Sequence, residues 1–478
     1  MSLSKSIAKN TIIHTLGRFS ASAIGVFVVA LMTRYLGTTG YGHFATIMAY
    51  LFFFTIIGDL GLYLVTVNEL GHAEDKKKYF SNIFTLRLVS TTVLMIIACA
   101  LIWVFPYPLI VKLGVLIFAG SSFFMMLDQI LIALFQSQMK THFPALAEVV
   151  GKLLILGLVI LAIQLKLGFL FVVLTFSLGL LIHFIINLSF ARRLLKFKLD
   201  FDKKIWQSIF KKSWPVATYM IFSMLYFKAD TIILSLYHPA SSVGIYGAPY
   251  KILEVLIVFP AIFMGLVSPH LSKSWAEKNL ENFKRIWQKA FDALSIIIWP
   301  MIFGTLVLAG PIINLIAGSQ FAASIPVLQI LIVATGVIFL AHLSTFSVVA
   351  VNKQKSMMKY YILAAALAMA FYFIFIPKYS YYAAALITIL IELFILIASW
   401  LMVRRTTKIK TSFSNNLKSL FISLIMAGIL YLALNLYGLG LTNFGLLVSL
   451  ILGAIIYLGG LYLFGLFKKE MITEFIKK

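Results

Sequence analysis

The chain has 478 residues, of which 62% are hydrophobic and only 12% are charged, with a formal net charge of +24. Soluble domains are roughly 45–50% apolar, and a soluble chain of this length needs far more polar surface to cover its core. The composition excludes a soluble protein and indicates an all-α polytopic membrane protein. The single cysteine, Cys99, excludes an internal disulfide.

Fourteen segments are long and apolar enough to span a bilayer, which takes about 20 residues per helix. The first follows two lysines and lacks the short apolar region and small-residue cleavage site of a secretory signal, so we expect it to be retained. In chain order, the segments are 11–33, 41–68, 81–104, 109–135, 144–164, 168–190, 214–237, 243–268, 290–309, 325–350, 358–376, 381–402, 417–437 and 443–466.

The distribution of positive charge predicts the orientation of these segments. With the N-terminus inside, the cytoplasmic connections carry most of the 40 lysines and arginines, and the outer connections carry Arg34, Lys112, Lys166 and Lys378. This asymmetry follows the positive-inside rule and predicts that both termini are cytoplasmic. The net charge then reflects topology and contact with anionic membrane lipids rather than binding of nucleic acid.

A weak internal repeat suggests how the segments are grouped. The stretches "RYLGTTGYGHFA" and "SLYHPASSVGIYGAPY" each contain an outer turn followed by Tyr-Gly, and Tyr41-Gly42 matches Tyr246-Gly247 at an offset of 205 residues. An offset of six helices preserves direction, so the repeats would be related by a pseudo-two-fold axis along the membrane normal. We therefore expect two six-helix lobes, at 10–200 and 205–405, and a C-terminal helix pair at 410–468.

Several stretches resemble the polysaccharide (Wzx-type) flippases of the multidrug/oligosaccharidyl-lipid/polysaccharide (MOP) exporter superfamily. They are "LMTRYLGTTGYGHFA", "GDLGL", "KADTIILSLYHPASSVGIYGAPYKILEVLIVFPAIFMGLVSPHLS" and "VNKQKSMMKYYILAAALAMAFYFIFIPKYSYYAAALITILIELF". The resemblance covers most of the chain, in the family's order and spacing. One departure is "PKYSYYAAA", where Ser380 and Tyr381 occupy an outer turn in which the family usually has glycines.

The resemblance implies two six-helix bundles around a central cavity that opens alternately to either side of a prokaryotic inner or plasma membrane. The implied substrate is a lipid-linked oligosaccharide, usually on undecaprenyl diphosphate, and other polysaccharide-assembly proteins are candidate partners. No Walker loop is present, so ATP does not drive the protein directly. We expect no cofactor, and no histidine pair has metal-ligand spacing.

Charged residues within spans are functional candidates, because a charge at mid-bilayer costs about 2.5–3.5 kcal/mol or more and must be paired or face water. Across neighbouring helices of the first lobe, Arg18 can pair with Asp59 and Arg87 with Asp128. On a single helix, Glu148 and Lys152 are four residues apart and can also pair. The six residues of the first lobe that fall in the predicted cytoplasmic half are Arg18, Asp59, Arg87, Asp128, Glu148 and Lys152.

A second group of charges lies nearer the midplane of the second lobe. Lys251 and Glu254 are three residues apart and can meet on one helix face. Lys228 and Asp230 point to nearly opposite sides of their helix, so one should face the cavity and the other should find a partner on a neighbouring helix. Binding of a substrate phosphate, ion coupling and pinning of two helices all remain open as roles for this group.

The candidate site contains four basic and four acidic residues. The substrate-binding candidates are Arg18, Arg34, Lys228 and Lys251. The ion-coupling or pairing candidates are Asp59, Asp230, Glu254 and Glu392.

Three functions are compatible with such a membrane protein. A glycan-lipid flippase is the interpretation that the resemblance favours, and a drug or cation antiporter of the same fold is the alternative. A membrane enzyme is disfavoured, because the longest outer connection, near "AGPIINLIAGSQFAAS", contains no charged residue that could take part in catalysis. We therefore expect a transporter and not an enzyme.

Overall fold

A computed structural model describes residues 3–59, 61–71, 74–437 and 443–466. Within these ranges, the side chains of residues 3–16, 18, 19, 215–227, 437 and 443 are outside the description.

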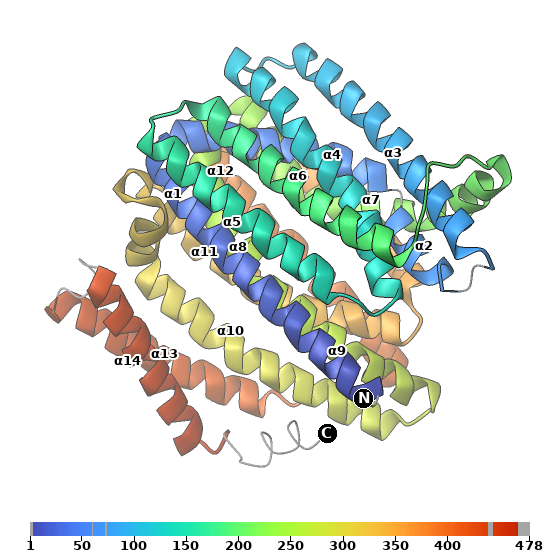
Figure 1. Cartoon of the computed structure of the whole chain (residues 1–478). Helices are drawn as coiled ribbons and strands as arrows, with labels where there is room; N and C mark the ends of the chain where they lie inside the picture. Colours follow the sequence, from blue (N-terminus) through green and yellow to red (C-terminus); the bar gives the residue numbers. More distant parts are fainter. Residues whose placement is uncertain (1–2, 60, 72–73, 438–442, 467–478) are drawn as a thin grey trace. The chain divides into compact units, whose positions relative to one another are not determined.

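The described residues fold into fourteen α-helices and two short 3-10 helices, without a strand (Figure 1). This confirms the predicted all-α class. The helices are α1 (Leu3–Asp59), α2 (Leu62–Glu69), α3 (Lys76–Leu101), η1 (Ile102–Val104), α4 (Leu109–Ser137), α5 (His142–Gln164), α6 (Phe169–Leu194), α7 (Lys203–Tyr237), α8 (Ala240–Leu256), α9 (Val258–Ala276), α10 (Leu280–Ala317), η2 (Ser319–Phe321), α11 (Ser324–Ala350), α12 (Gln354–Thr407), α13 (Ser414–Tyr437) and α14 (Asn443–Leu463).

Two helices are too long for a single crossing. α1 has 57 residues and α12 has 54, which at 1.5 Å per residue is about 80 Å, against about 30 Å of hydrocarbon core. Each contains one non-helical residue, Gly37 (φ 69°, ψ −177°) in α1 and Ser380 (φ 53°, ψ −137°) in α12. Each therefore accounts for two of the predicted spans.

The number of spans agrees with the sequence. By length and composition, eleven helical stretches of the described residues can cross a membrane. The two broken helices are among them and count twice, which gives thirteen crossings. The 35-residue α7, which covers the predicted span 214–237, is the fourteenth. The prediction of a polytopic protein with about fourteen transmembrane segments is confirmed.

Ser380 adopts a backbone conformation that favours glycine, at the position where the sequence departs from the resembled family. Its positive φ of 53° brings the side chain against its own backbone, which a residue without a Cβ avoids. We expect Ser380→Gly to raise the stability by about 1 kcal/mol, measured as a higher midpoint of thermal unfolding in lipid nanodiscs. Ser399→Gly, in a regular helical turn of α12, is the control and should lower the midpoint. An unchanged midpoint for Ser380→Gly would contradict the inference that the backbone of Ser380 is strained.

The chain packs into two compact units. The first comprises Met1–Gly247 with Tyr372–Ser380, and the second comprises Ala248–Phe371 with Tyr381–Lys478. This division concerns packing within the chain, and the lobes expected at 10–200, 205–405 and 410–468 remain a prediction.

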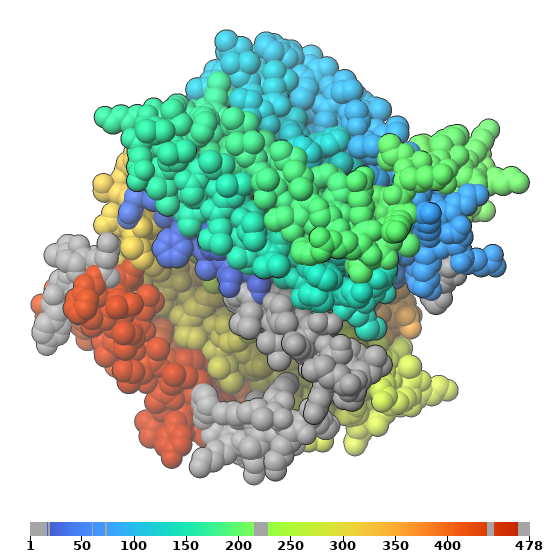
Figure 2. Space-filling view, in the orientation of Figure 1, coloured from blue at the N-terminus to red at the C-terminus, as the bar shows by residue number. Residues whose placement is uncertain are grey.

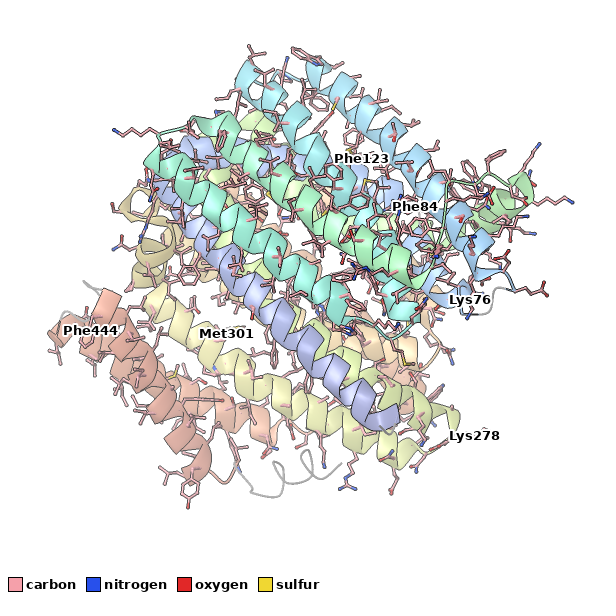
Figure 3. All side chains as sticks on the ribbon, viewed as in Figure 1. Lys76, Phe84, Phe123, Lys278, Met301 and Phe444 are labelled. Carbon is pink, nitrogen blue, oxygen red and sulfur yellow. The ribbon has the colours of Figure 1, made fainter. Side chains whose placement is uncertain are left out.

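In the first unit, α4 packs against α3 and α6, and α5 packs against α1 and α6. α5 and α6 run side by side, and their side chains meet on the face shown in Figure 2. Phe84 on α3 and Phe123 on α4 belong to an apolar cluster in this unit (Figure 3). In the second unit, α10 packs against α9, α11 and α13, and α14 packs against α13.

The connection between α6 and α7 is bound to the start of α3 by polar contacts. The amide of Asp202 donates to Asn82 Oδ1 at 2.6 Å, and the amide of Asp200 donates to Thr85 Oγ1 at 2.9 Å. Lys78 forms an ion pair with Asp202 at 2.8 Å, and its hydrogen bond holds the pKa of that carboxyl below the usual range. These contacts fix where α7 begins.

The two stretches of the predicted repeat contact each other directly. A Cβ added at Gly42 would lie 1.7 Å from the carbonyl oxygen of Ala240, and one added at Gly244 would lie 2.0 Å from that of Thr38. Thr38 and Ala240 are 202 residues apart in the sequence, and so are Gly42 and Gly244. The contact of Gly42 with Ala240 is therefore repeated, with the two stretches exchanged, as the contact of Gly244 with Thr38. This is the pattern of a local two-fold axis. This contact does not use the Tyr-Gly match at 205. Small residues allow such backbone-to-backbone approach between membrane helices.

We expect Gly42→Ala and Gly244→Ala each to destabilise the protein by about 1–3 kcal/mol, because the added methyl group meets a backbone carbonyl that cannot rotate away. The measurement is the thermal unfolding midpoint in nanodiscs. Gly25→Ala is the matched control, since a Cβ at Gly25 meets nothing within 4 Å. Equal midpoints for Gly42→Ala and Gly25→Ala would show that the contact does not form.

Candidate functional site

The eight candidate residues belong to both units. Arg18, Arg34, Asp59, Lys228 and Asp230 lie in the first unit. The second unit contains Lys251, Glu254 and Glu392. The side chain of Arg18 lies outside the described residues, so its pairing with Asp59 remains a prediction.

Arg87 is the most completely buried cation among the described residues, with 0% of the residue exposed. Its guanidinium donates to the carbonyl oxygens of Gly58, at 2.5 Å, and Met126, at 2.9 Å, and to Gln129 Oε1 at 2.6 Å. It also forms an ion pair with Asp59 at 3.4 Å. The expected pairing of Arg87 with Asp128 is wrong.

The local backbone explains why Arg87 is needed at this place. α1 ends at Asp59, and Gly61 has a left-handed conformation with φ 71°. The last carbonyl groups of a helix have no intrahelical donors, and a cation at that end is favoured by the helix dipole. Arg87 therefore satisfies the end of α1 and ties it to α4.

Asp128 has different partners. It accepts a hydrogen bond from Asn187 Nδ2 at 2.8 Å, and its other carboxylate oxygen lies 3.4 Å from His183 Nε2. Met126 and Gln129 present the face of α4 that meets α3, whereas Asp128 faces α6. Similar depth in the membrane had suggested the pairing with Arg87, but depth does not determine the rotation of a helix about its axis.

Lys228 and Asp230 differ in their burial. Asp230 is only 1% exposed. Its carboxylate accepts hydrogen bonds from the Tyr246 hydroxyl, at 2.5 Å, and from the amide and hydroxyl of Thr231, at 2.5 and 3.1 Å. Lys228 is half-buried. The expected partner on a neighbouring helix is thus the phenol of Tyr246 on α8.

Lys251 and Glu254 form the ion pair that their spacing allows, with 2.7 Å between Nζ and Oε2. Their side chains are 35% and 23% exposed. The lysine is therefore neutralised in part by its own helix, while it stays accessible from outside the core.

The two remaining candidates lie at different depths in the fold. Arg34 is exposed and precedes the break of α1 at Gly37 by three residues. Glu392 is 6% exposed and lies on α12. Among the residues with described side chains, no group of three or more His, Cys, Asp or Glu is arranged to hold a metal ion.

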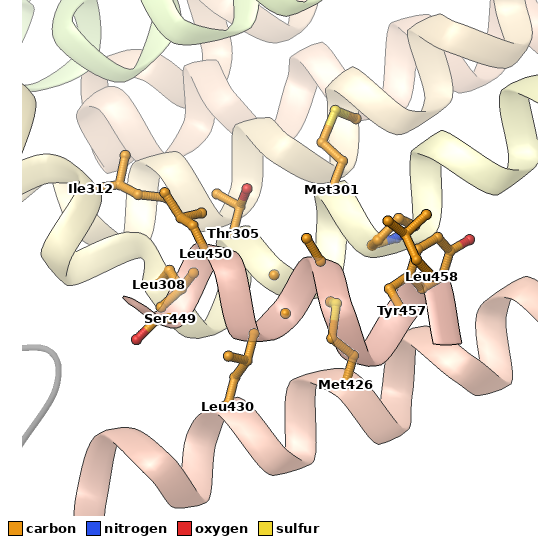
Figure 4. A pocket seen from close by; sticks show the side chains of 14 residues that line it. Met301, Thr305, Leu308, Ile312, Met426, Leu430, Ser449, Leu450, Tyr457 and Leu458 are labelled. Atoms are coloured by element: carbon orange, nitrogen blue, oxygen red, sulfur yellow. The ribbon is translucent and has the colours of Figure 1, made fainter. Parts of the chain in front are cut away.

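An apolar groove of about 370 Å³ lies between α10, α13 and α14 in the second unit (Figure 4). Gly304 and Gly453 leave room in its walls. The larger side chains around it include those of Met301, Leu308, Met426, Leu430, Leu450 and Tyr457. This groove could not be predicted from the sequence, because three separate apolar helices build it and their individual patterns do not show which faces meet.

The fold is that of a class of membrane transporters. The structure is similar to that of the lipid II flippase MurJ in an inward closed conformation, with a TM-score of 0.80 and 19% identity over 95% of this chain and 98% of that one. It is also similar to an inward-facing multidrug resistance MATE family transporter of the MOP superfamily, with a TM-score of 0.67 and 11% identity over 83% and 98% of the two chains. A MOP superfamily transporter from Pyrococcus furiosus matches with a TM-score of 0.58 and 15% identity, over 84% and 96%.

A family model for polysaccharide biosynthesis proteins matches residues 7–275. The chain therefore belongs to this family, and its fold is that of the MOP transporters. The predicted resemblance is confirmed at this level. None of the curated protein sequences compared with the chain matches it significantly.

Proposed function

We propose that this protein is a flippase that moves a lipid-linked oligosaccharide from the cytoplasmic to the outer leaflet of a prokaryotic inner membrane. The carrier lipid would be undecaprenyl diphosphate, and transport would occur by alternating access with both termini in the cytoplasm. The main support is the combination of a polysaccharide biosynthesis family with a fold similar, over 95% of the chain, to a lipid II flippase.

In this proposal, basic side chains bind the diphosphate of the carrier. Lys228 is half-buried on a transmembrane helix, and a phosphate group in reach of its ammonium is attracted more strongly there than in bulk water. Lys251 is already paired with Glu254 at 2.7 Å, and a phosphate would share this cation. We also propose that Arg18 contacts the diphosphate or lines its route, and that Arg34 is near the outer exit.

The groove between α10, α13 and α14 supports a lipid substrate. Its lining of methionine, leucine and glycine residues suits a flexible hydrocarbon chain, because thioether side chains adapt to irregular apolar surfaces. An isoprenoid tail could lie there while the diphosphate is bound elsewhere.

The acidic candidates would then have two kinds of role. Asp59 and Glu254 pair with Arg87 and Lys251, respectively, and we assign them to structure. Asp230 and Glu392 are more deeply buried, at 1% and 6% exposure, and are the candidates for coupling to an ion gradient.

A drug or cation antiporter is the second candidate, because MATE transporters share the fold. A cationic drug needs an acidic binding site. Among the candidates with described side chains, the most exposed is the cation Arg34, and the acids Asp230 and Glu392 are buried. The family match also favours the glycan-lipid substrate.

The proposal is tested by depleting the protein in its own cells and extracting lipid-linked oligosaccharides. We expect surface polysaccharide to fall while the carrier-linked precursor accumulates on the cytoplasmic leaflet. Normal surface polysaccharide, together with increased sensitivity to cationic drugs, would instead favour the antiporter.

A further inference from the structure

Besides the groove in the second unit, the structure has a cavity of about 350 Å³ in the first unit. It lies at the helix ends beside the break at Gly37. The second part of α1, the connection from η1 to α4, and the junction of α7 with α8 surround it. Its polar and aromatic lining comprises His43, Thr46, Tyr107, Ser235, Tyr237 and His238. The positive-inside pattern predicts that this end of the unit faces the outside of the cell.

No charged side chain contributes to the described lining of this cavity. An anion would find no lysine or arginine to neutralise it, and an organic cation would find no carboxylate. Burial of an unpaired charge is unfavourable, so the lining favours a neutral ligand.

Three of the cavity's four hydroxyl groups, those of Thr46, Tyr107 and Ser235, have already donated their protons. Ser235 donates to the carbonyl oxygen of Ile232 at 2.7 Å, so Tyr107, which lies 2.7 Å from Ser235 Oγ, must be the donor in that contact. Thr46 donates to the carbonyl oxygen of Gly42 at 2.9 Å. Each hydroxyl has one proton and two lone pairs, and a bound ligand would therefore meet these three groups as acceptors.

The histidines complete this pattern. His238 Nε2 lies 2.8 Å from the carbonyl oxygen of Ile376, so Nε2 carries the proton and Nδ1 is an acceptor in the neutral ring. His43 makes an edge-on contact with Phe169, with ring centroids 6.1 Å apart, and its ring can supply one N–H donor and one acceptor. The ligand that matches this set carries several hydroxyl groups, which donate to the acceptors and accept from His43.

The walls are also rigid and partly aromatic. Tyr107 stacks on Phe105 at 5.8 Å with an interplanar angle of 12°, and Pro106 and Pro108 restrict the backbone on both sides of it. Tyr237 is 53% exposed. An aromatic ring with a polar edge packs against an apolar surface while it keeps a hydrogen bond, and sugar rings have both apolar faces and hydroxyl edges.

We propose that this cavity is a binding site for a neutral sugar, formed by the first unit at the outer end of its helices. Its size lies at the lower end of the roughly 300–1,000 Å³ of small-molecule sites, which suits one sugar residue rather than a whole glycan. The assignment of that sugar to the transported glycan rests on the proposed flippase function. Binding of the sugar itself requires neither the lipid carrier nor transport.

The test is saturation-transfer NMR on the full-length protein in nanodiscs, with free glucose, galactose, mannose, rhamnose, N-acetylglucosamine and N-acetylgalactosamine as probes. Glucuronic acid and inorganic phosphate serve as charged comparisons. We expect at least one neutral sugar to bind with millimolar affinity and to exceed both anions. Absence of transfer to all six neutral sugars, or equal binding of glucuronic acid, would overturn the proposal.

Two near-isosteric variants locate the binding. His43→Phe keeps the ring contact but removes both nitrogens, and Tyr107→Phe removes the acceptor oxygen. Each should weaken binding roughly three- to tenfold, as expected for the loss of one hydrogen bond. Tyr431→Phe is the control, because Tyr431 lies on α13 and is 60% exposed. His43→Gln, which keeps an N–H donor and an acceptor, should restore most of the binding lost in His43→Phe.

The outcomes separate this inference from the proposed function. Sugar binding that is unaffected by His43→Phe and Tyr107→Phe, or that is reduced equally by Tyr431→Phe, would overturn the inference. Lipid-linked glycan transport without any binding of free sugar would overturn it as well, while leaving the flippase intact. Sugar binding that depends on these residues, in a protein that transports no glycan lipid, would support the site and defeat the flippase proposal.

Discussion

Replacement of Arg87 by methionine is expected to destabilise the first unit by about 3–5 kcal/mol, the range for breaking a buried ion pair. Methionine fills much of the volume but leaves the Asp59 carboxylate without its cation. It also leaves the carbonyl groups of Gly58 and Met126 without their donor. The thermal unfolding midpoint in nanodiscs measures the loss.

Two further variants sharpen this result. Arg193→Met removes a cation from an exposed position on α6 and should leave the midpoint nearly unchanged. Arg87→Met combined with Asp59→Asn removes both charges and should recover part of the loss, because the stranded carboxylate is then neutral. If Arg87→Met behaves like Arg193→Met, the buried network does not hold the end of α1.

Simultaneous replacement of Lys228 and Lys251 by alanine is expected to abolish export of the glycan lipid while protein abundance stays near normal. Both lysines are accessible in part, whereas Arg87 is fully buried. If they bind the diphosphate, their removal leaves the headgroup without the two cations that compensate for its loss of hydration. Export is measured as surface polysaccharide in cells that lack the native gene.

The controls for this double variant preserve either the charge or the site. Lys228→Arg/Lys251→Arg keeps both charges and should retain partial export, although the guanidinium binds phosphate with a different geometry. Lys76→Ala/Lys284→Ala removes two exposed lysines at helix starts and should export normally. Full export by Lys228→Ala/Lys251→Ala would contradict substrate binding by these lysines and would show that they serve only in packing or pairing.

The helices could be predicted from the sequence because each transmembrane segment carries its own signal. About 20 apolar residues with polar ends suffice. Boundaries shifted, as for α10, which extends from Leu280 to Ala317 around the predicted 290–309, and the predicted span 243–268 is divided between α8 and α9. The pairing of Lys251 with Glu254 could be predicted for the same reason, since residues three apart on a helix are neighbours.

Contacts between helices were harder to predict. Asp59 rather than Asp128 faces Arg87, because the break after α1 and the rotation of α4 decide which side chains meet. The sugar-sized cavity combines residues from three distant parts of the sequence, and no single stretch indicates it. The repeat was recognised from Tyr-Gly, but the contact that joins its two stretches uses Gly42 and Gly244, a relation that only the packed backbone reveals.

The most direct test of the central claim is a flipping measurement in reconstituted vesicles. Undecaprenyl-diphosphate oligosaccharide with a fluorescent label on the glycan is placed in both leaflets, and an impermeant quencher is added outside. If the protein is a glycan-lipid flippase, vesicles that contain it should lose nearly all fluorescence, whereas protein-free vesicles and those with Lys228→Ala/Lys251→Ala should keep about half. Equal protection of the label in vesicles with and without the protein, while the same vesicles exchange a cationic dye, would contradict the account.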